Sequence, residues 1–357
     1  MNPSDHELSY TFGDTLPDHG SALEVAPGVL WLRMGLPFAL NHINLWLLRD
    51  TMEINGKPTQ GWTVVDCGID NAATREGWES VIAHHMQGLP VLRVVVTHMH
   101  PDHIGLAHWL CERFDAPLWI SATDYQSARV GLYDPQGFGS AASGDFYASH
   151  GLRDPEFHQH LQTRRSYYPT LVPRLPASYM RMMDGDTLTI DGAEWHCIAG
   201  YGHAPEHIAL HCPGKKLLIS GDMVLPRIST NVSVFSMEPE SNPLRLFLDS
   251  LERYLPLADD TLTLPSHGKP FVGLHTRIEQ LKAHHDDRLN ALRVRCKEDI
   301  DGVSATDALP ILFSRTLDAH QLTFAVGEAV AHLHLLWRQG EVARRLGADG
   351  IYRFMST

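Results

Sequence analysis

The chain has 357 residues, of which 43% are hydrophobic and 20% are charged, as in ordinary soluble globular proteins. The formal net charge is −13, and it lies entirely in the first 275 residues, because acidic and basic residues are equal in number from residue 276 onward. A protein that grips a polyanion normally carries a Lys/Arg surface, so we expect no nucleic-acid partner.

The N-terminal residues lack the basic and apolar regions of a signal peptide, and no apolar run approaches the ~18 residues of a membrane span. The five cysteines form no C-x-x-C pair, and an odd number suits a reducing compartment. We therefore expect a cytoplasmic protein without a membrane partner. Its length predicts one large domain and a smaller one.

The first strong pattern in the chain is the run 91–96, which is short, apolar and β-branched. This composition predicts a buried strand. Pro101 and the spaced apolar residues after it predict a helix that extends to Phe114, with proline in its first turn. The residues between strand and helix lie at the carboxyl end of the strand, where open α/β sheets usually place their sites.

This loop contains His98, His100, Asp102 and His103, an H-x-H-x-D-H cluster. Three imidazoles and a carboxylate are poor material for a core and are common metal ligands. On a loop, His98 and His100 can face one ion while Asp102 and His103 face another. The alternative, a histidine-rich surface loop in a chain with 23 histidines, explains neither the spacing nor the position.

Residues 124–185 form an insertion rich in aromatic side chains, among them Tyr167 and Tyr168. Aromatic residues on so long a connection favour a lid over a partly apolar pocket. The alternative is a set of extra helices that cover an exposed sheet edge.

Three further strand patterns each end at a ligand-type side chain beside glycine: 195–199 precedes His203, 216–220 precedes Asp222, and 261–265 precedes His267. Glycine lets the backbone approach closely at such positions. Each pattern alone is typical of an ordinary turn, but their order behind the first cluster indicates a shared site.

Beyond residue 275 the patterns predict helices over 276–295, 305–313 and 324–339, then a hairpin of 342–346 and 351–354. This order resembles a winged-helix unit. The third helix offers poor phosphate-binding chemistry, so we expect the unit to pack, to form a homo-oligomer or to shape the rim of the active site. His284 and His285 are expected at the surface.

The H-x-H-x-D-H cluster is followed in order by His203, Asp222 and His267. With this ligand pattern the chain resembles the metallo-β-lactamase superfamily, in particular its dinuclear glyoxalase II-like thioesterases, over about residues 25–275. The resemblance implies an α/β fold, a four-layer αββα sandwich with the metals at one sheet edge. The catalytic domain would span 1–275, with the insertion inside it, and the winged-helix-like domain 276–357.

The resemblance also implies the role of each site residue. One ion would be held by His98, His100 and His203, the other by Asp102, His103 and His267, and both by Asp222. Asp102 and Asp222 would thereby serve catalysis. Asp66 resembles the family's buried carboxylate that accepts the distal N–H of a ligand histidine. A turn residue that caps Gly68 is the alternative for Asp66.

Imidazole and carboxylate ligands suit two Zn²⁺ ions, although Fe or Mn would fit the same donors. A hydroxide that bridges the two ions would attack a carbonyl. The expected activity is that of a thioesterase, like a hydroxyacylglutathione hydrolase, or of a lactonase, on a small-molecule ester or thioester, with β-lactams ranked lower. Two alternatives remain open: an endoribonuclease or phosphodiesterase of the same fold, and a non-catalytic regulatory or effector-binding protein.

Overall fold

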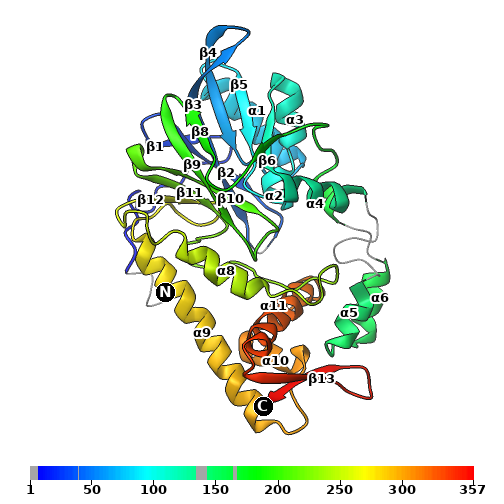
Figure 1. Cartoon of the computed structure of the whole chain (residues 1–357). Coiled ribbons are helices and arrows are strands. Elements are labelled where there is room, and N and C mark those ends of the chain that lie inside the picture. The colour runs from blue at the N-terminus through cyan, green and yellow to red at the C-terminus, as the bar shows by residue number, and fades with distance from the viewer. Residues whose placement is uncertain (1–6, 39, 134–142, 164–166) are drawn as a thin grey trace.

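The computed structural model describes residues 7–38, 40–133, 143–163 and 167–357 (Figure 1). Among these residues, no helix is both long enough and apolar enough to cross a membrane.

The first sheet has seven strands in the order β1-β2-β3-β4-β5-β6-β7. Their bounds are β1 Ala22–Ala26, β2 Val29–Gly35, β3 His42–Ile54, β4 Lys57–Val65, β5 Val91–Val95, β6 Leu118–Ser121 and β7 Met180–Met182. The first four are antiparallel neighbours, and β4 to β7 run parallel. The carboxyl ends of β4 and β5, which precede Asp66 and His98, therefore meet at one edge.

The second sheet has five strands in the order β12-β11-β10-β9-β8. Their bounds are β8 Thr187–Ile190, β9 Ala193–Gly200, β10 His207–Cys212, β11 Leu217–Gly221 and β12 Leu262–Pro265. Only β11 and β12 are parallel. Asp222 and His267, which follow these two strands, are thus brought to the same edge.

The two sheets pack face to face through a buried core that includes Trp31 and Trp46 from the first sheet and Trp195 from the second. On the outer face of the first sheet lie α1 (Ala72–His84) and α3 (Ala107–Phe114). On the outer face of the second lies α8 (Pro243–Glu252), with the C-terminal helices beyond it. This is the expected αββα sandwich (Figure 1).

The helix predicted from Pro101 to Phe114 is divided in two, α2 (Pro101–Ile104) and α3. The break follows from close packing, since a Cβ on Gly105 would lie 2.6 Å from the carbonyl oxygen of Gly68. The amide of Leu106 donates to that same oxygen at 3.0 Å instead of continuing the helix.

The insertion forms α4 (Ala122–Tyr133), α5 (Gly144–Ser149), α6 (Pro155–Thr163) and α7 (Tyr168–Leu171) before β7. Its aromatic side chains separate into two groups. Phe146 and Phe157 of α5 and α6 pack in the core of the C-terminal unit, whereas Tyr168 packs against the first sheet. The insertion thus packs against both the first sheet and the C-terminal unit, and its role as a lid stays a prediction.

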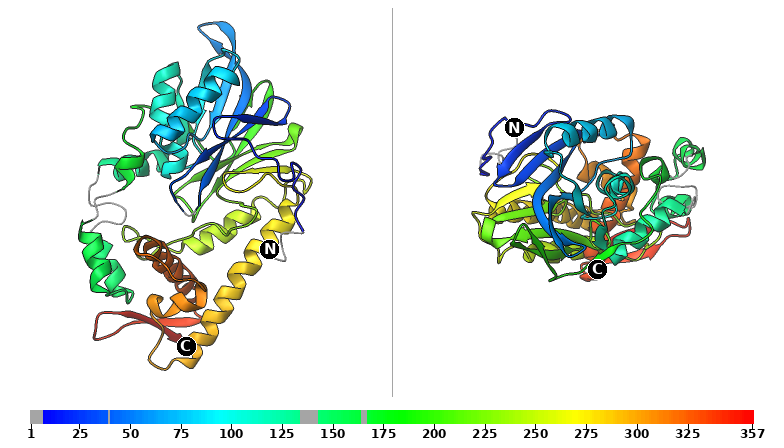
Figure 2. Two further views of the ribbon diagram at one scale, coloured as in Figure 1. Left: turned by 180° about the vertical axis from the view of Figure 1, so that it is seen from behind. Right: turned by 90° about the horizontal axis from the view of Figure 1, so that it is seen from above.

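The C-terminal unit contains α9 (Leu274–Glu298), α10 (Ala305–Leu312), α11 (Ala319–Arg338) and the hairpin β13 (Val342–Leu346) and β14 (Tyr352–Ser356). Figure 2 shows α9 running from the sandwich to the far end of the molecule, beside the hairpin. The predicted order of elements is confirmed. The third helix starts five residues earlier than predicted, because Asp318 caps it by accepting the amide of Gln321 at 2.8 Å.

The surface position predicted for His285 is wrong. This residue is buried between α9 and α11, and its Nδ1 lies 3.1 Å from Nε2 of His332. The helical pattern of α9 did not show which of its faces α11 would cover. One hydrophobic core also continues across residue 275, since Phe247 of α8 and Ile278 of α9 belong to the same cluster as Val330 of α11.

Candidate metal centre

The strand ends bring all seven predicted ligands to one place. The loop after β5 carries His98, His100, Asp102 and His103, while His203, Asp222 and His267 follow β9, β11 and β12. Their ligand atoms form three groups, each with all its atoms within 4.8 Å: His98 with His100 and His203, His98 with His103 and Asp222, and Asp102 with His103 and His267.

The first predicted ligand set is formed by three imidazoles. Nε2 of His98 lies 2.9 Å from Nδ1 of His100 and 3.3 Å from Nε2 of His203. His100 therefore faces its neighbours with Nδ1, whereas the other two rings use Nε2.

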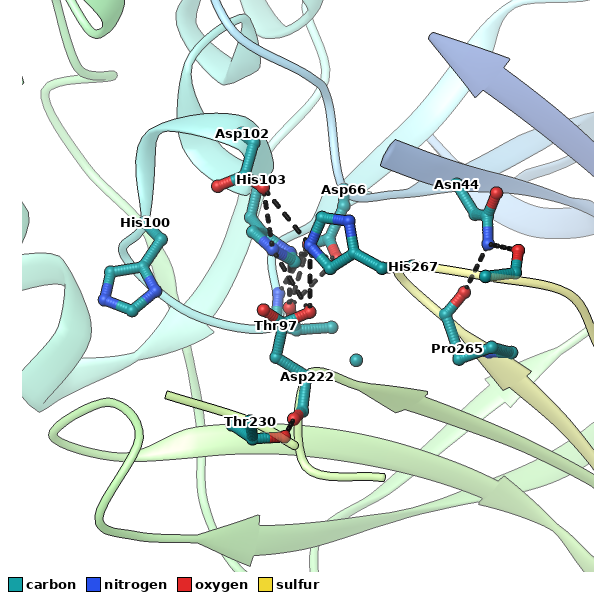
Figure 3. Close-up of polar contacts among 12 residues, drawn as sticks. Asn44, Asp66, Thr97, His100, Asp102, His103, Asp222, Thr230, Pro265 and His267 are labelled. Atoms are coloured by element: carbon teal, nitrogen blue, oxygen red, sulfur yellow. Dashed lines mark hydrogen bonds and ion pairs between the residues drawn. The ribbon is translucent and has the colours of Figure 1, made fainter. Parts of the chain in front are cut away.

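The second predicted set lies beside the first. Oδ2 of Asp102 is 3.4 Å from Nε2 of His267 and 3.7 Å from Nε2 of His103. These three side chains converge above Asp222 (Figure 3).

Asp222 lies between the two sets and presents one oxygen to each. Its Oδ2 is 3.3 Å from Nε2 of His203. Its Oδ1 is 3.6 Å from Nε2 of His103 and 3.4 Å from Nε2 of His267. This is the arrangement expected of a carboxylate that bridges two ions.

Two buried polar atoms show that these residues fit metal ions. Nε2 of His103 and Oδ1 of Asp222 have no hydrogen-bond partner, and such groups are costly to bury. The separations of 3.3 to 3.7 Å exceed good hydrogen bonds. They are close to the edge of about 3.3 Å that a tetrahedron with zinc–nitrogen bonds of ~2.0 Å would have.

The pKa shifts also differ between the two ligand sets. Burial lowers the pKa of His98 well below its usual value and that of His100 to about 3, so both imidazoles are neutral, as metal ligands must be. Burial also disfavours the charged forms of His103 and Asp102. Neighbouring opposite charges outweigh that effect, raising the pKa of His103 to about 9 and lowering that of Asp102 to about 2. The second set therefore stabilises positive charge, which a bound cation would supply in place of protons.

Asp66 fixes the orientation of His103. Its Oδ2 accepts the Nδ1–H of His103 at 2.8 Å, which leaves Nε2 directed at the centre (Figure 3). Its Oδ1 accepts the amide of Thr97, also at 2.8 Å. Asp66 adopts a left-handed backbone conformation (φ +61°), which is uncommon outside glycine but favoured by aspartate and asparagine. The contact to His103 is the one predicted for Asp66.

Three partners of the ligand histidines were missed by the sequence reasoning. Nδ1 of His203 lies 2.8 Å from the carbonyl oxygen of Asn231, and Nδ1 of His267 lies 2.8 Å from that of His42. The hydroxyl of Thr97 lies between Asp66 and His98, 3.0 Å from Nδ1 of the latter. Of these three partners, only Thr97 could have been predicted from the sequence, because it directly precedes the cluster.

Asp124 ties two ligand loops together. It is fully buried; its Oδ1 accepts the amide of Met99, between His98 and His100, at 2.8 Å. Its Oδ2 accepts the amide of Glu206, three residues after His203, at 2.6 Å. No spacing in the sequence marks this residue.

His207, the first residue of β10, supports the Asp222 loop. Its Nε2 accepts the amide of Asp222 at 3.2 Å. The ring lies so close that a Cβ on Gly221, whose φ is +54°, would be 2.0 Å from Nε2. The glycine before Asp222 is therefore required by this contact.

The centre opens into a cavity of about 290 Å³. His100, Asp102, His203, Asp222 and His267 form its floor. Most of the remaining lining residues are apolar or aromatic and come from outside the strand ends.

The fold and the centre agree with the family comparison. The chain belongs to the metallo-beta-lactamase superfamily, whose family model matches residues 44–267. A second model, the metallo-beta-lactamase-like C-terminal domain, matches residues 289–357.

Individual relatives support the same class. Probable metallo-hydrolase YqjP of Bacillus subtilis (strain 168) is 24% identical over 330 residues, which cover 91% of this chain and 97% of the relative. A crystal structure of a beta-lactamase domain protein from Burkholderia ambifaria is 54% identical, with a TM-score of 0.92 and complete coverage of both chains. Metallo-beta-lactamase family protein TTHA1429 from Thermus thermophilus is 28% identical, with a TM-score of 0.74 over 94% of this chain and 100% of that one. The protein is a metallo-hydrolase of this superfamily.

Proposed function

We propose that the protein is a dinuclear metal-dependent hydrolase of small-molecule carboxylic esters, with thioesters as the leading substrates and lactones next. The observation that carries this proposal is the position of Asp222, which presents Oδ2 to His203 and Oδ1 to His103 and His267. Seven ligand-type side chains exceed what one tetrahedral ion can use.

In this proposal His98, His100 and His203 hold one ion, Asp102, His103 and His267 hold the other, and Asp222 contacts both. Zinc suits the nitrogen and oxygen donors best, and iron or manganese fits the same set. When bound, two such ions act as Lewis acids and lower the pKa of a coordinated water towards ~7, which provides a hydroxide nucleophile at neutral pH.

The chain's own residues supply orientation and a dry environment. Asp66 holds Nδ1 of His103, and the carbonyl oxygens of Asn231 and His42 hold Nδ1 of His203 and His267, so that each Nε2 faces the centre. The apolar walls limit the access of water to a bound carbonyl, which strengthens electrostatic interactions there.

The described part of the chain shows no specific contact that favours RNA cleavage or a regulatory role. Among the residues that the structure describes, neither lysine nor arginine lines the cavity, although phosphate recognition normally uses them.

The test combines metal analysis with a substrate panel. Protein purified without chelators should contain two ions per chain and should cleave a simple thioester faster than a lactone, a β-lactam or a phosphodiester. A single ion at full activity would contradict the dinuclear assignment. A clear preference for the phosphodiester would contradict the substrate class.

A further inference from the structure

The cavity wall is assembled from segments that are far apart in the sequence. Phe38 comes from the loop after β2, Tyr167 and Leu171 from the α7 region, Ile228 from the loop after β11, and Phe324 from α11. Phe38 and Ile228 expose 40% and 44% of their surface and line the cavity, so apolar surface is accessible there to a ligand.

Helix α11 is joined to the insertion across this wall. The ring of His320, in the first turn of α11, lies 5.9 Å from that of Tyr167 at an interplanar angle of 89°. It lies 5.2 Å from the ring of Phe324 at 83°. Both are edge-to-face geometries of the kind that aromatic pairs prefer, so these rings form one continuous surface.

Helix α11 is also joined to the loop that carries Ile228. The amide of Val234 donates to the carbonyl oxygen of Gly327 at 3.0 Å, and Ser233 Oγ donates to that of Phe324 at 3.2 Å. A Cβ on Gly327 would lie 2.8 Å from that of Ser233, so the loop and the helix are in close contact. The wall is thus held in place by backbone contacts and is preformed.

We propose that this wall binds a neutral, apolar acyl chain, and that Phe324 and Ile228 determine which chain lengths are accepted. The inference rests on the proposed function, because it places the carbonyl of the substrate at the His/Asp floor and its acyl chain along the wall. A chain of this kind gains about fourfold in affinity for each methylene group that it buries. A polar group at its end would lose its hydrogen bonds to water among apolar side chains.

The test uses acetyl, butanoyl and hexanoyl thioesters of N-acetylcysteamine with the metal-loaded protein. We expect kcat/KM to rise about fourfold per methylene until the chain fills the cavity. The 4-methoxybutanoyl thioester has nearly the shape of the hexanoyl one, but an ether oxygen replaces a methylene, so most of the gain should be lost. A kcat/KM that is independent of chain length, with hydrolysis intact, would overturn this inference and leave the proposed function standing.

Two variants locate the effect. Phe324→Ala and Ile228→Asn should each reduce the rise in kcat/KM to less than about twofold per methylene. Ile228→Asn should fold normally, because the side chain of Ile228 is exposed. Phe313→Ala is the matched control, because Phe313 is a half-buried phenylalanine of the same unit outside this cavity. An unchanged slope in both wall variants would overturn the role of these residues.

A binding measurement tests this inference independently of hydrolysis. Calorimetry should show that hexanamide, an uncleaved analogue with two more methylenes, binds the metal-loaded protein about 15-fold more tightly than butanamide, and that Phe324→Ala removes most of this difference. If no thioester is cleaved but this difference is found, the proposed function fails and the binding wall stands. If butanamide and hexanamide bind alike, the wall is overturned.

Discussion

The floor and the wall of the cavity differ in origin and in chemistry. The floor consists of histidines and aspartates on strand-end loops of the sandwich, most of them buried and held by hydrogen bonds to a second layer of residues. The wall consists of apolar side chains from α7, α11 and two loops. The sandwich therefore sets the reaction class, whereas the added segments are free to set the substrate, which is how one fold serves many activities.

The largest loss of metal binding and turnover should follow removal of Asp222, the carboxylate that the two ligand sets share. Asp222→Ala should lose at least one ion and several orders of magnitude in turnover, and Asp102→Ala should lose turnover to a similar extent. Both variants should fold, because these side chains lie on loops outside the sandwich core. Metal analysis, circular dichroism and initial rates check this. A folded Asp222→Ala protein with both ions would remove this residue from the bridge.

Asp66 should have the next largest effect, although it contacts no ion in our proposal. Asp66→Asn keeps a side chain that tolerates the left-handed backbone. It removes the negative charge behind His103, so we expect a ~10- to 100-fold loss in metal affinity or activity. Asp191→Asn is the matched control, since Asp191 is an exposed aspartate with φ +50° outside the site. Equal behaviour of the two variants would contradict the role assigned to Asp66.

Asp124 tests whether the two ligand loops must be tied together. An amide has only one acceptor oxygen, so Asp124→Asn leaves the amide of Met99 or that of Glu206 without its partner. We expect roughly tenfold weaker metal binding with little change in KM. Asp154→Asn, which alters an ordinary helix cap at Phe157, should leave metal binding unchanged. A large rise in KM with normal metal content would contradict a positioning role.

The same division explains what could be predicted from the sequence. The floor could be predicted because strand patterns end beside glycine at His203, Asp222 and His267, in that order behind the H-x-H-x-D-H cluster, as in the family that the chain resembles. Asp124 and Phe324 could not be found, because their roles depend on contacts between distant segments that no local spacing records. His285 was misjudged for the same reason, since the face of α9 that it occupies is buried only by α11.

The neighbouring tyrosines of the insertion should behave differently from each other, although no sequence pattern separates them. Tyr167 lines the wall and contacts His320, so Tyr167→Ala should raise KM more than it lowers kcat, by about threefold to tenfold. Tyr168 also borders the cavity, but it is buried, and its hydroxyl donates to the carbonyl oxygen of Met99 in the ligand loop at 2.6 Å. Tyr168→Phe should therefore lower metal affinity or kcat and leave chain-length preference unchanged. Identical kinetic profiles for the two variants would erase the distinction between floor and wall at this position.

The smallest expected effect lies in the C-terminal unit and concerns stability alone. Glu328 of α11 is buried near Arg288, and burial raises the pKa of its carboxyl to about 7, although Arg288 acts in the opposite direction. The folded protein then holds this proton more tightly than the unfolded chain, whose glutamates titrate near the usual 4.5. Stability from this group is complete below that value and is lost as the pH rises through about 7.

The Glu328→Gln side chain stays neutral at every pH. The free energy of unfolding of this variant, relative to that of the parent protein, should therefore increase by roughly 1 to 3 kcal/mol from pH 5 to pH 8. Burial lowers the pKa values of the nearby His285 and His332 to about 2 and about 4, so both are neutral in the folded protein throughout this window. Their protonation in the unfolded chain affects variant and parent alike and cancels in the difference. Glu298→Gln, an exposed glutamate of α9, should show no such trend. Denaturant unfolding across this pH range checks the prediction, with metal content and turnover expected to stay unchanged. A difference between variant and parent that does not vary with pH would show that Glu328 is already ionised at pH 5 in the folded protein.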